Sequence, residues 1–237
     1  MKMSANWEQL PFDFGDQPIF NKDDLVITQA NRLAYKLIHE WPNWPQPVAL
    51  LIGPMGSGKS HFSSVWREKS NAYVADMRQL DKAIECAHHG RSILLEDVDS
   101  ETIDEVKLFH LFNTVAQMHI AMPPVSLLMT ARTTPKMWGL HLKDLASRMN
   151  LITHITIEQP DDFLLSAVLI KLFSDKQIFV EKRVINYILE HMERSLTMAN
   201  LLVNKADKIA LAQKRKITKP LISEALAILE TEKFYKN

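Results

Sequence analysis

The sequence contains one cysteine, Cys86, and its formal net charge is zero, from 28 basic and 28 acidic residues. A single cysteine excludes an internal disulfide framework and is typical of a reducing compartment. The balanced charge argues against a protein whose main function is to bind DNA or RNA, because such proteins usually carry an excess of basic residues. We therefore expect a cytoplasmic protein with no stable direct DNA binding.

Signals for a membrane, for secretion and for zinc are also missing. No apolar run approaches the length of a membrane span, and the start of the chain lacks the apolar core of a signal peptide. The nine histidines are scattered without the spacing of a zinc site. With 237 residues and 46% hydrophobic content, the chain is long enough to bury one substantial core and a small second domain.

The strongest motif is Gly53–Ser60, which has the phosphate-loop pattern of Gly, four free positions and Gly-Lys-Ser. The glycines let backbone N–H groups turn toward phosphates, Lys59 adds a positive charge, and the Ser60 hydroxyl can bind Mg²⁺. The loop follows the apolar run Val48–Ile52 and leads into a helix over His61–Lys69, whose N-terminus would face the phosphates. This context favours a nucleotide site over a glycine-rich turn that binds nothing.

Strand and helix patterns alternate around this loop. Strands are predicted at 48–52, 72–75, 92–95, 125–129 and 152–157, and helices at 29–41, 61–69, 77–89, 101–119 and 143–148. Thr28 is predicted to cap the first helix. The alternation predicts an α/β fold with a parallel five-stranded sheet. Beyond Gln159-Pro160-Asp161, only helices are expected, at 161–176, 181–192, 197–213 and 219–230.

Polar side chains end two of the predicted strands. Glu96 and Asp97 follow one apolar strand, and Thr130 ends the next. In a phosphate-loop protein one acid of such a pair holds Mg²⁺ through water and the other polarises the attacking water. Thr130 would reach the γ-phosphate or that water. The alternative is an acidic turn without function, which is common at strand ends.

Two further stretches allow more than one interpretation. The segment Gln9–Phe14 places the large apolar residues Leu10, Phe12 and Phe14 around a proline. The segment could be a strap packed on its own domain, a homodimer contact, or a peptide whose side chains enter pockets on another protein. A basic stretch near the C-terminus usually forms a solvated helical face, and a contact with DNA phosphates or an acidic partner is the minority interpretation. Its members are Lys205, Lys208, Lys214, Arg215, Lys216 and Lys219.

The loop, the acidic strand end, Thr130, Leu145–Arg148 and the helical tail together resemble the AAA+ ATPases of the DnaA family, including its shorter Hda branch. The resemblance covers residues 18–230. It implies that Val26–Asn31 forms the entry to an adenine pocket and that Arg148 is an arginine finger acting in trans. The nucleotide-binding residues implied for ADP or ATP are Val26, Ile27, Asn31, Pro54, Met55, Gly56, Ser57, Gly58, Lys59, Ser60 and His61.

Comparison with this family also brings out differences. DnaA continues into a helix-turn-helix DNA-binding domain where this sequence ends at Asn237. The family's lid arginine falls on Thr197, with Arg194 one turn earlier, so ADP should bind at least as tightly as ATP. The resemblance also assigns Mg²⁺ to Glu96, where the family usually has Asp, and catalysis to Asp97. The changes at Thr197 and at Glu96 imply weak intrinsic ATPase activity at most.

The N-terminal peptide resembles the motif by which replication proteins dock on the DNA sliding clamp, which would use Gln9, Leu10, Phe12 and Phe14. The organisation expected is a clamp-binding peptide at 1–17, an AAA+ domain at 18–159 and a helical lid at 160–237. The resemblance implies a clamp-docked regulator that stimulates ATP hydrolysis by the DnaA initiator. An autonomous ATPase or loader and a non-catalytic, nucleotide-gated adaptor remain alternatives.

Overall fold

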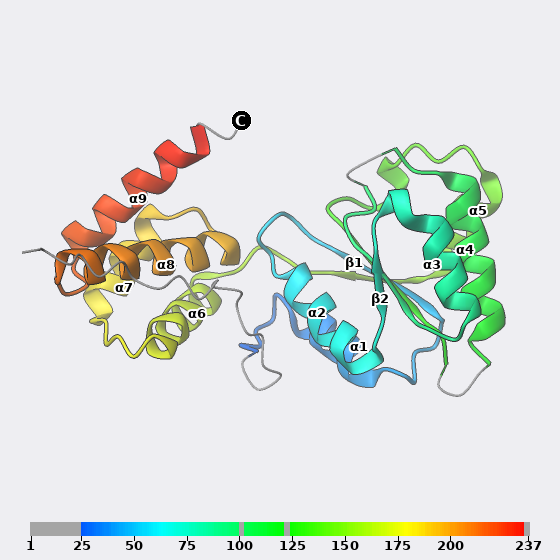
Figure 1. Cartoon of the computed structure of the whole chain (residues 1–237), viewed down its shortest axis with the longest axis horizontal. Coiled ribbons are helices and arrows are strands. Elements are labelled where there is room, and N and C mark those ends of the chain that lie inside the picture. The colour runs from blue at the N-terminus through cyan, green and yellow to red at the C-terminus, as the bar shows by residue number, and fades with distance from the viewer. Residues whose placement is uncertain (1–24, 100–101, 121–123, 235–237) are drawn as a thin grey trace, which may run out of the picture.

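A computed structural model of the chain describes residues 25–99, 102–120 and 124–234 (Figure 1). The molecule is elongated, with an α/β lobe at one end of its long axis and a purely helical lobe at the other. The predicted clamp peptide, at residues 9–14, lies outside the described residues. In the part of the chain that is described, no helix is both long and apolar enough to cross a membrane.

The α/β lobe is built on a parallel sheet with the strand order β2-β3-β4-β1-β5. The strands are β1 (Val48–Ile52), β2 (Tyr73–Ala75), β3 (Ile93–Leu95), β4 (Leu127–Ala131) and β5 (Thr153–Thr156). In the register, Ile52 lies opposite Ala131 and Leu95 lies opposite Met129. The carboxyl ends of β1, β3 and β4 therefore meet at one edge of the sheet, where parallel α/β sheets place their ligands.

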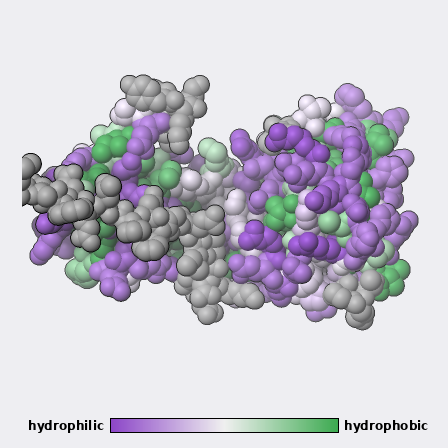
Figure 2. All heavy atoms as spheres, viewed as in Figure 1, coloured by the Kyte–Doolittle hydropathy of each residue, from purple (hydrophilic) through white to green (hydrophobic). Residues whose placement is uncertain are grey.

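Helices cover both faces of this sheet, because a parallel sheet is stable only when both faces are buried. Leu50 and its neighbours pack on α3 (Leu80–His88), α4 (Glu105–Met118) and α5 (Lys143–Leu151). Leu51 points to the opposite face and packs under α1 (Arg32–Glu40) and α2 (Lys59–Ser70). On the outside, hydrophilic residues cover most of this lobe on the face shown in Figure 2.

The helical lobe has a core of its own. It consists of α6 (Asp162–Asp175), α7 (Lys182–His191), α8 (Leu196–Gln213) and α9 (Lys219–Phe234). Apolar side chains from all four helices are buried together, among them Leu169, Ile188, Leu202 and Ile222. The predicted α/β class, with a five-stranded parallel sheet and a helical lid, is confirmed.

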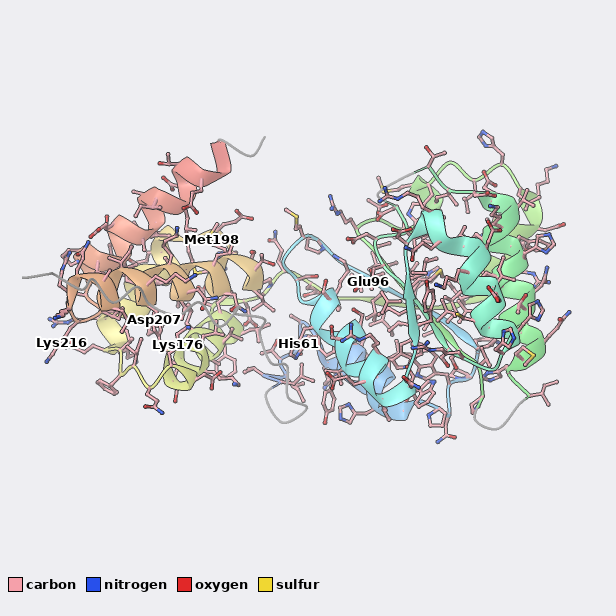
Figure 3. All side chains as sticks on the ribbon, viewed as in Figure 1. His61, Glu96, Lys176, Met198, Asp207 and Lys216 are labelled. Carbon is pink, nitrogen blue, oxygen red and sulfur yellow. The ribbon has the colours of Figure 1, made fainter. Side chains whose placement is uncertain are left out.

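Two members of the basic stretch of the lid, Lys205 and Arg215, are paired with acids. Lys205 lies 2.6 Å from Glu232, and Arg215 lies 3.3 Å from Glu224. Outside this stretch, Lys176, which directly follows α6, forms an ion pair of 3.2 Å with Asp207 of α8; both are labelled in Figure 3. These pairs agree with a solvated helical face rather than with a surface built for phosphates.

One local prediction is wrong. Thr28 does not cap the first helix, because α1 begins at Arg32 and its N-cap is Asn31. The Asn31 side chain accepts a hydrogen bond of 2.9 Å from the Thr28 N–H and donates one of 2.9 Å to the Val26 carbonyl. The buried amide of Asn31 therefore ties down the preceding turn, and this turn forms part of the site described next.

A candidate nucleotide pocket between the two lobes

A pocket of about 320 Å³ lies between the lobes. One wall comes from the α/β lobe: the segment before α1, the phosphate loop with the start of α2, and the carboxyl ends of β3 and β4. The opposite wall comes from one face of α6 and the first turn of α8. The lining residues are Leu25, Val26, Asn31, Met55, Gly56, Gly58, Lys59, Ser60, His61, Phe62, Asp97, Arg132, Leu164, Val168, Lys171, Leu172, Asp175, Leu196, Thr197 and Asn200.

The phosphate loop joins the carboxyl end of β1 to the N-terminus of α2. Its first residue is anchored by a hydrogen bond of 3.1 Å from the Gly53 N–H to the Ala131 carbonyl of β4. Gly56 and Gly58 have φ values of +76° and +103°, which side chains with a Cβ rarely adopt. The chain can then begin α2 at Lys59, so that the free N–H groups of the first helical turn face an anion.

Lys59 is buried in this loop. Its ammonium donates hydrogen bonds of 2.7 Å to the Gly53 carbonyl and 3.1 Å to the Pro54 carbonyl. Burial lowers the pKa of Lys59; the charge of Asp97 opposes that shift and the charge of Arg132 adds to it. An ammonium has three donors, so two bonds to the loop leave one donor for a phosphate oxygen.

The lid contacts the phosphate loop directly. The Leu196 N–H, in the first turn of α8, donates a hydrogen bond of 2.9 Å to the Gly56 carbonyl. Ser195 caps the same helix by accepting 2.9 Å from the Met198 N–H. A Cβ on Gly56 would lie 2.4 Å from the Ser195 Cβ, so only glycine permits this approach. A shift of the lid is therefore coupled to the loop that would hold the phosphates.

Of the two acids predicted at the end of β3, Asp97 lines the pocket and Glu96 does not. Asp97 lines the pocket in a left-handed conformation with φ of +48°, and its N–H donates 2.9 Å to the Thr130 hydroxyl. Thr130 is buried and does not line the pocket, so it positions Asp97. Glu96 accepts a hydrogen bond of 2.8 Å from the Ser63 hydroxyl of α2. Figure 3 shows Glu96 within the α/β lobe, whereas His61 lies between the lobes.

The pocket wall offers oxygen atoms that suit a Mg²⁺ ion, which binds oxygen ligands. The Ser60 hydroxyl and the Asp97 carboxylate share the pocket wall. The assignment of the metal to Glu96 stays a prediction. One of its oxygens accepts the hydrogen bond from Ser63, and Glu96 is not among the described residues that line the pocket.

Both the helical lobe and the fold as a whole are similar to known proteins. Residues 166–226 match the family model of the Hda lid domain. The fold is similar to domain III of DnaA from Thermotoga maritima, with a TM-score of 0.72 and 16% identity over 89% of this chain and 97% of that one. The lid is thus similar to the Hda lid domain, and the fold of the chain is that of DnaA domain III.

Two further solved structures have a similar fold. DnaA from Aquifex aeolicus bound to AMPPCP has a TM-score of 0.65 and 18% identity, over 93% of this chain and 71% of that one. The Holliday junction branch migration motor RuvB from Thermotoga maritima has a TM-score of 0.64 and 14% identity, over 86% and 70%. No curated protein sequence matches the chain.

The pocket brings together most, not all, of the predicted nucleotide-binding residues. Val26, Asn31, Met55, Gly56, Gly58, Lys59, Ser60 and His61 line it. Ile27, Pro54 and Ser57 are outside the lining among the described residues. Ser57 is a buried residue of the loop, and its hydroxyl has no hydrogen-bond partner in the described part of the chain. The Asn31 amide is occupied by backbone groups and shapes the pocket entry.

Arg148 lies on α5, outside this lining, and its guanidinium stacks on the Phe109 ring of α4. The two lid positions compared with the family's lid arginine, Thr197 and Arg194, differ in whether they line the pocket. Thr197 faces the pocket, but Arg194 forms an ion pair of 2.9 Å with Asp162 and does not line it. Arg194 therefore does not replace a lid arginine in this arrangement.

Sequence reasoning missed the α6 wall and Arg132. Leu164, Val168 and Leu172 follow one another at helical spacing and offer an apolar surface to a base, with the Lys171–Asp175 ion pair of 2.7 Å beside them. The same spacing is equally typical of a buried core stripe, so it could not single out a pocket. Arg132 follows the same strand as Thr130, two residues further along the chain, and a position after a strand does not by itself distinguish a pocket residue from an exposed one.

Proposed function

We propose that this protein is an adenine-nucleotide-binding regulator of chromosomal replication initiation. It docks on the DNA sliding clamp through residues 9–14 and stimulates ATP hydrolysis by the DnaA initiator. The observation that carries the proposal is the hydrogen bond from Leu196 to Gly56, which joins a phosphate loop to a lid that matches the Hda lid family. The pocket between them is where an adenine nucleotide would bind.

The nucleotide fits the two walls in one orientation. Its phosphates bind the loop N–H groups, Lys59 and the N-terminus of α2, while its base packs between Val26 and the apolar residues Leu164 and Val168 of α6. Bound Mg²⁺ would neutralise phosphate charge, held by Ser60 and by the acids after β3. The similarity in fold to a DnaA solved with AMPPCP supports an adenine nucleotide here.

Stimulation of DnaA needs a group that acts outside the protein's own pocket, and Arg148 fits that requirement. It lies on α5, half-buried, with its guanidinium against Phe109. A guanidinium stays charged at any physiological pH and can reach two phosphate oxygens at once. An arginine supplied in trans to a phosphoryl transfer accelerates it by roughly 10³- to 10⁵-fold in related systems.

A second candidate is a nucleotide-gated adaptor without catalysis, and the contact between Leu196 and Gly56 favours it as well. Nucleotide in the pocket would then order the lid for a partner. Weak intrinsic hydrolysis agrees with both candidates, because Glu96 is engaged with Ser63 and Thr197 brings no charge to the phosphates.

The test follows labelled ATP bound to purified DnaA, with and without DNA-loaded clamp and this protein. The proposal expects hydrolysis on DnaA to accelerate only when clamp and protein are both present, and Arg148→Ala to abolish the acceleration. Lys143→Ala is the matched control, because Lys143 is an exposed cation on the same helix. Clamp and DnaA binding without acceleration would favour the adaptor, and turnover by the protein alone would favour an autonomous ATPase.

A further inference from the structure

Two side chains of α4 contact α5, the helix that carries Arg148, and the two helices lie side by side (Figure 1). Glu105 and Phe109 are four residues apart, a spacing that puts them on one face of α4. Phe109 contacts the Arg148 guanidinium in the last turn of α5. Glu105 contacts the backbone where α5 begins. One face of α4 therefore holds both ends of a helix of only nine residues.

The contact at the start of α5 is made by the Glu105 carboxylate. One of its oxygens accepts hydrogen bonds of 2.9 Å from the His141 N–H and 2.6 Å from the Leu142 N–H. The other oxygen accepts 3.0 Å from the His141 N–H. The bonds from His141 and Leu142 lower the pKa of Glu105; burial opposes this shift, and the charge of His141 adds to it. The carboxylate is therefore ionised at neutral pH.

These bonds replace a cap that α5 does not have. Its N-cap is Leu142, whose side chain makes no capping hydrogen bond. In a capping box, a Glu or Gln at the third helical position accepts from the N–H of the N-cap. That position in α5 is Leu145, which is buried in the core. Glu105 supplies the missing acceptor from the neighbouring helix, and α4 itself is capped by Asp104, which accepts 3.1 Å from the Lys107 N–H.

The start of α5 also follows a long connection. Residues 132–142 join β4 to α5, with the 3₁₀ turn Pro135–Met137 in between. Leu145 and Met149 turn one face of α5 into the core. Apolar packing has little directionality, whereas hydrogen bonds fix distance and angle. The position of α5 along its axis is thus set by polar contacts at its ends, from Glu105 at the start and from the His154 ring, 2.8 Å from the Met149 carbonyl, at the finish.

The position of α5 matters because of where Arg148 stands on it. The arginine is six residues after Leu142, which is about 9 Å along a helix. The Phe109 ring orients the guanidinium, and the position of α5 decides how far the guanidinium reaches. A misplacement of about 1 Å can cost roughly 100-fold in the rate of a reaction that depends on alignment.

We propose that Glu105 is a positioning residue for Arg148: its carboxylate fixes where α5 begins, and thereby where the guanidinium meets the phosphates of the partner's nucleotide. The inference rests on the trans-acting role of Arg148 proposed above and adds what sets the geometry of that arginine. Glu105 touches neither nucleotide nor partner in this role. It acts through the helix on which Arg148 stands.

The experiment measures ATP hydrolysis on DnaA at increasing concentrations of this protein, with DNA-loaded clamp present. Glu105→Ala should lower the maximal rate roughly tenfold, because alignment is lost. The concentration that gives half of the maximal rate should stay within about twofold of the wild type, because docking is not affected. Glu105→Gln should recover part of the rate, since its amide oxygen can still accept from the Leu142 N–H but carries no charge.

Asp144→Ala is the matched control. Asp144 is an exposed acid in the first turn of α5, so its loss removes the same charge near the start of the helix and leaves the bonds of Glu105 in place. Its maximal rate should match that of the wild type. A wild-type rate in Glu105→Ala, an equal loss in Asp144→Ala, or a loss confined to the half-maximal concentration overturns the positioning role.

Hydrogen exchange of the protein alone separates this inference from the proposed function. In Glu105→Ala, the amides of residues 141–148 should exchange faster than in the wild type and in Asp144→Ala; equal exchange would show that the carboxylate does not hold α5. A wild-type protein that fails to stimulate DnaA would refute the proposed function, and the role of Glu105 in stimulation with it, whatever the exchange shows. If Glu105→Ala melts far below the wild type, the same rates and exchange measured with Glu105→Gln decide the question.

Discussion

The guanidinium carbon of Arg148 lies 4.9 Å from the centroid of the Phe109 ring. Arg148 is half-buried at this contact, and Phe109 packs in turn against the core under α3, α4 and α5. A cation over an aromatic face gains on the order of 0.5–1 kcal/mol at such a site. The contact holds the arginine of α5 in one orientation without using any of its five N–H donors.

This relationship leads to a graded prediction for stimulation of DnaA. Arg148→Ala should leave the protein's own nucleotide affinity unchanged and reduce stimulation by roughly 10³-fold or more. Phe109→Leu keeps apolar volume but removes the aromatic face, so it should reduce stimulation only about two- to fivefold. Initial rates of ATP hydrolysis on DnaA measure both. Stimulation by Arg148→Ala at the wild-type rate would refute the trans-acting role.

Lys59 should be required for nucleotide binding but not for folding. Lys59→Ala removes the cation of the phosphate loop, and we expect no measurable ADP or ATP binding by calorimetry. It also removes the donor of the Gly53 and Pro54 carbonyls, so the free energy of unfolding should fall by about 1 kcal/mol. Circular dichroism melting tests the second point. Nucleotide binding that survives this substitution would mean that the loop does not hold the phosphates.

Gly56 should be essential for docking of the lid. In Gly56→Ala the new Cβ would lie 2.4 Å from the Ser195 Cβ, in addition to the strain of φ +76°. Gly139→Ala is the matched control, since its φ is +63° and nothing lies within 4 Å of the added Cβ. Both variants should lose about 1–2 kcal/mol through backbone strain.

Only Gly56→Ala should change the relation of the two lobes. We expect weaker nucleotide binding and a larger radius of gyration by small-angle X-ray scattering for this variant alone. Equal scattering profiles and equal nucleotide affinities in the two variants would show that the contact between Leu196 and Gly56 does not hold the lid.

Asp99 should make stability depend on pH. Partial burial disfavours its ionisation, but hydrogen bonds from the Thr133 hydroxyl and from the Arg132 and Thr133 N–H groups outweigh burial and lower its pKa. Since the folded pKa lies below the unfolded value of about 3.9, the carboxylate stabilises the fold above that pH, and its contribution is lost as the pH falls through the folded value.

Asp99→Asn should therefore lower the free energy of unfolding by about 1 kcal/mol at pH 7, and the difference from the wild type should shrink below about pH 4. Urea denaturation at a series of pH values measures it. Glu190→Gln, an exposed position on α7, serves as the control. A difference that stays constant from pH 7 to pH 3 would show that the charge of Asp99 is not what stabilises the loop.

The N-terminal peptide is predicted to bind the sliding clamp without belonging to the core. Replacing Gln9, Leu10, Phe12 and Phe14 with alanine should abolish clamp binding by surface plasmon resonance and leave the melting temperature within about 1–2 °C of the wild type. A large fall in melting temperature would favour a strap packed on the protein itself. Clamp binding by the quadruple variant would rule out the peptide as the main contact.

Much of the fold could be predicted from local pattern. The run Val48–Ile52 is apolar at every position, as a strand buried on both faces must be, and all five residues are buried in β1. The glycines and lysine of Gly53–Ser60 predicted a strand–loop–helix unit, and α2 begins at Lys59. Strands alternating with helices leave few arrangements other than a parallel sheet, because parallel strands need crossover connections.

The sequence by itself thus determined the elements, the class of fold and the loop that would hold phosphates, since each depends on neighbours along the chain. The tertiary structure decided which distant residues meet. Placing β1 between β4 and β5 brings Arg132 beside Lys59, and docking of α8 puts Leu196 on Gly56 and turns Thr197 to the pocket. Such contacts depend on strand order and on how two lobes pack, which no periodicity in the sequence encodes.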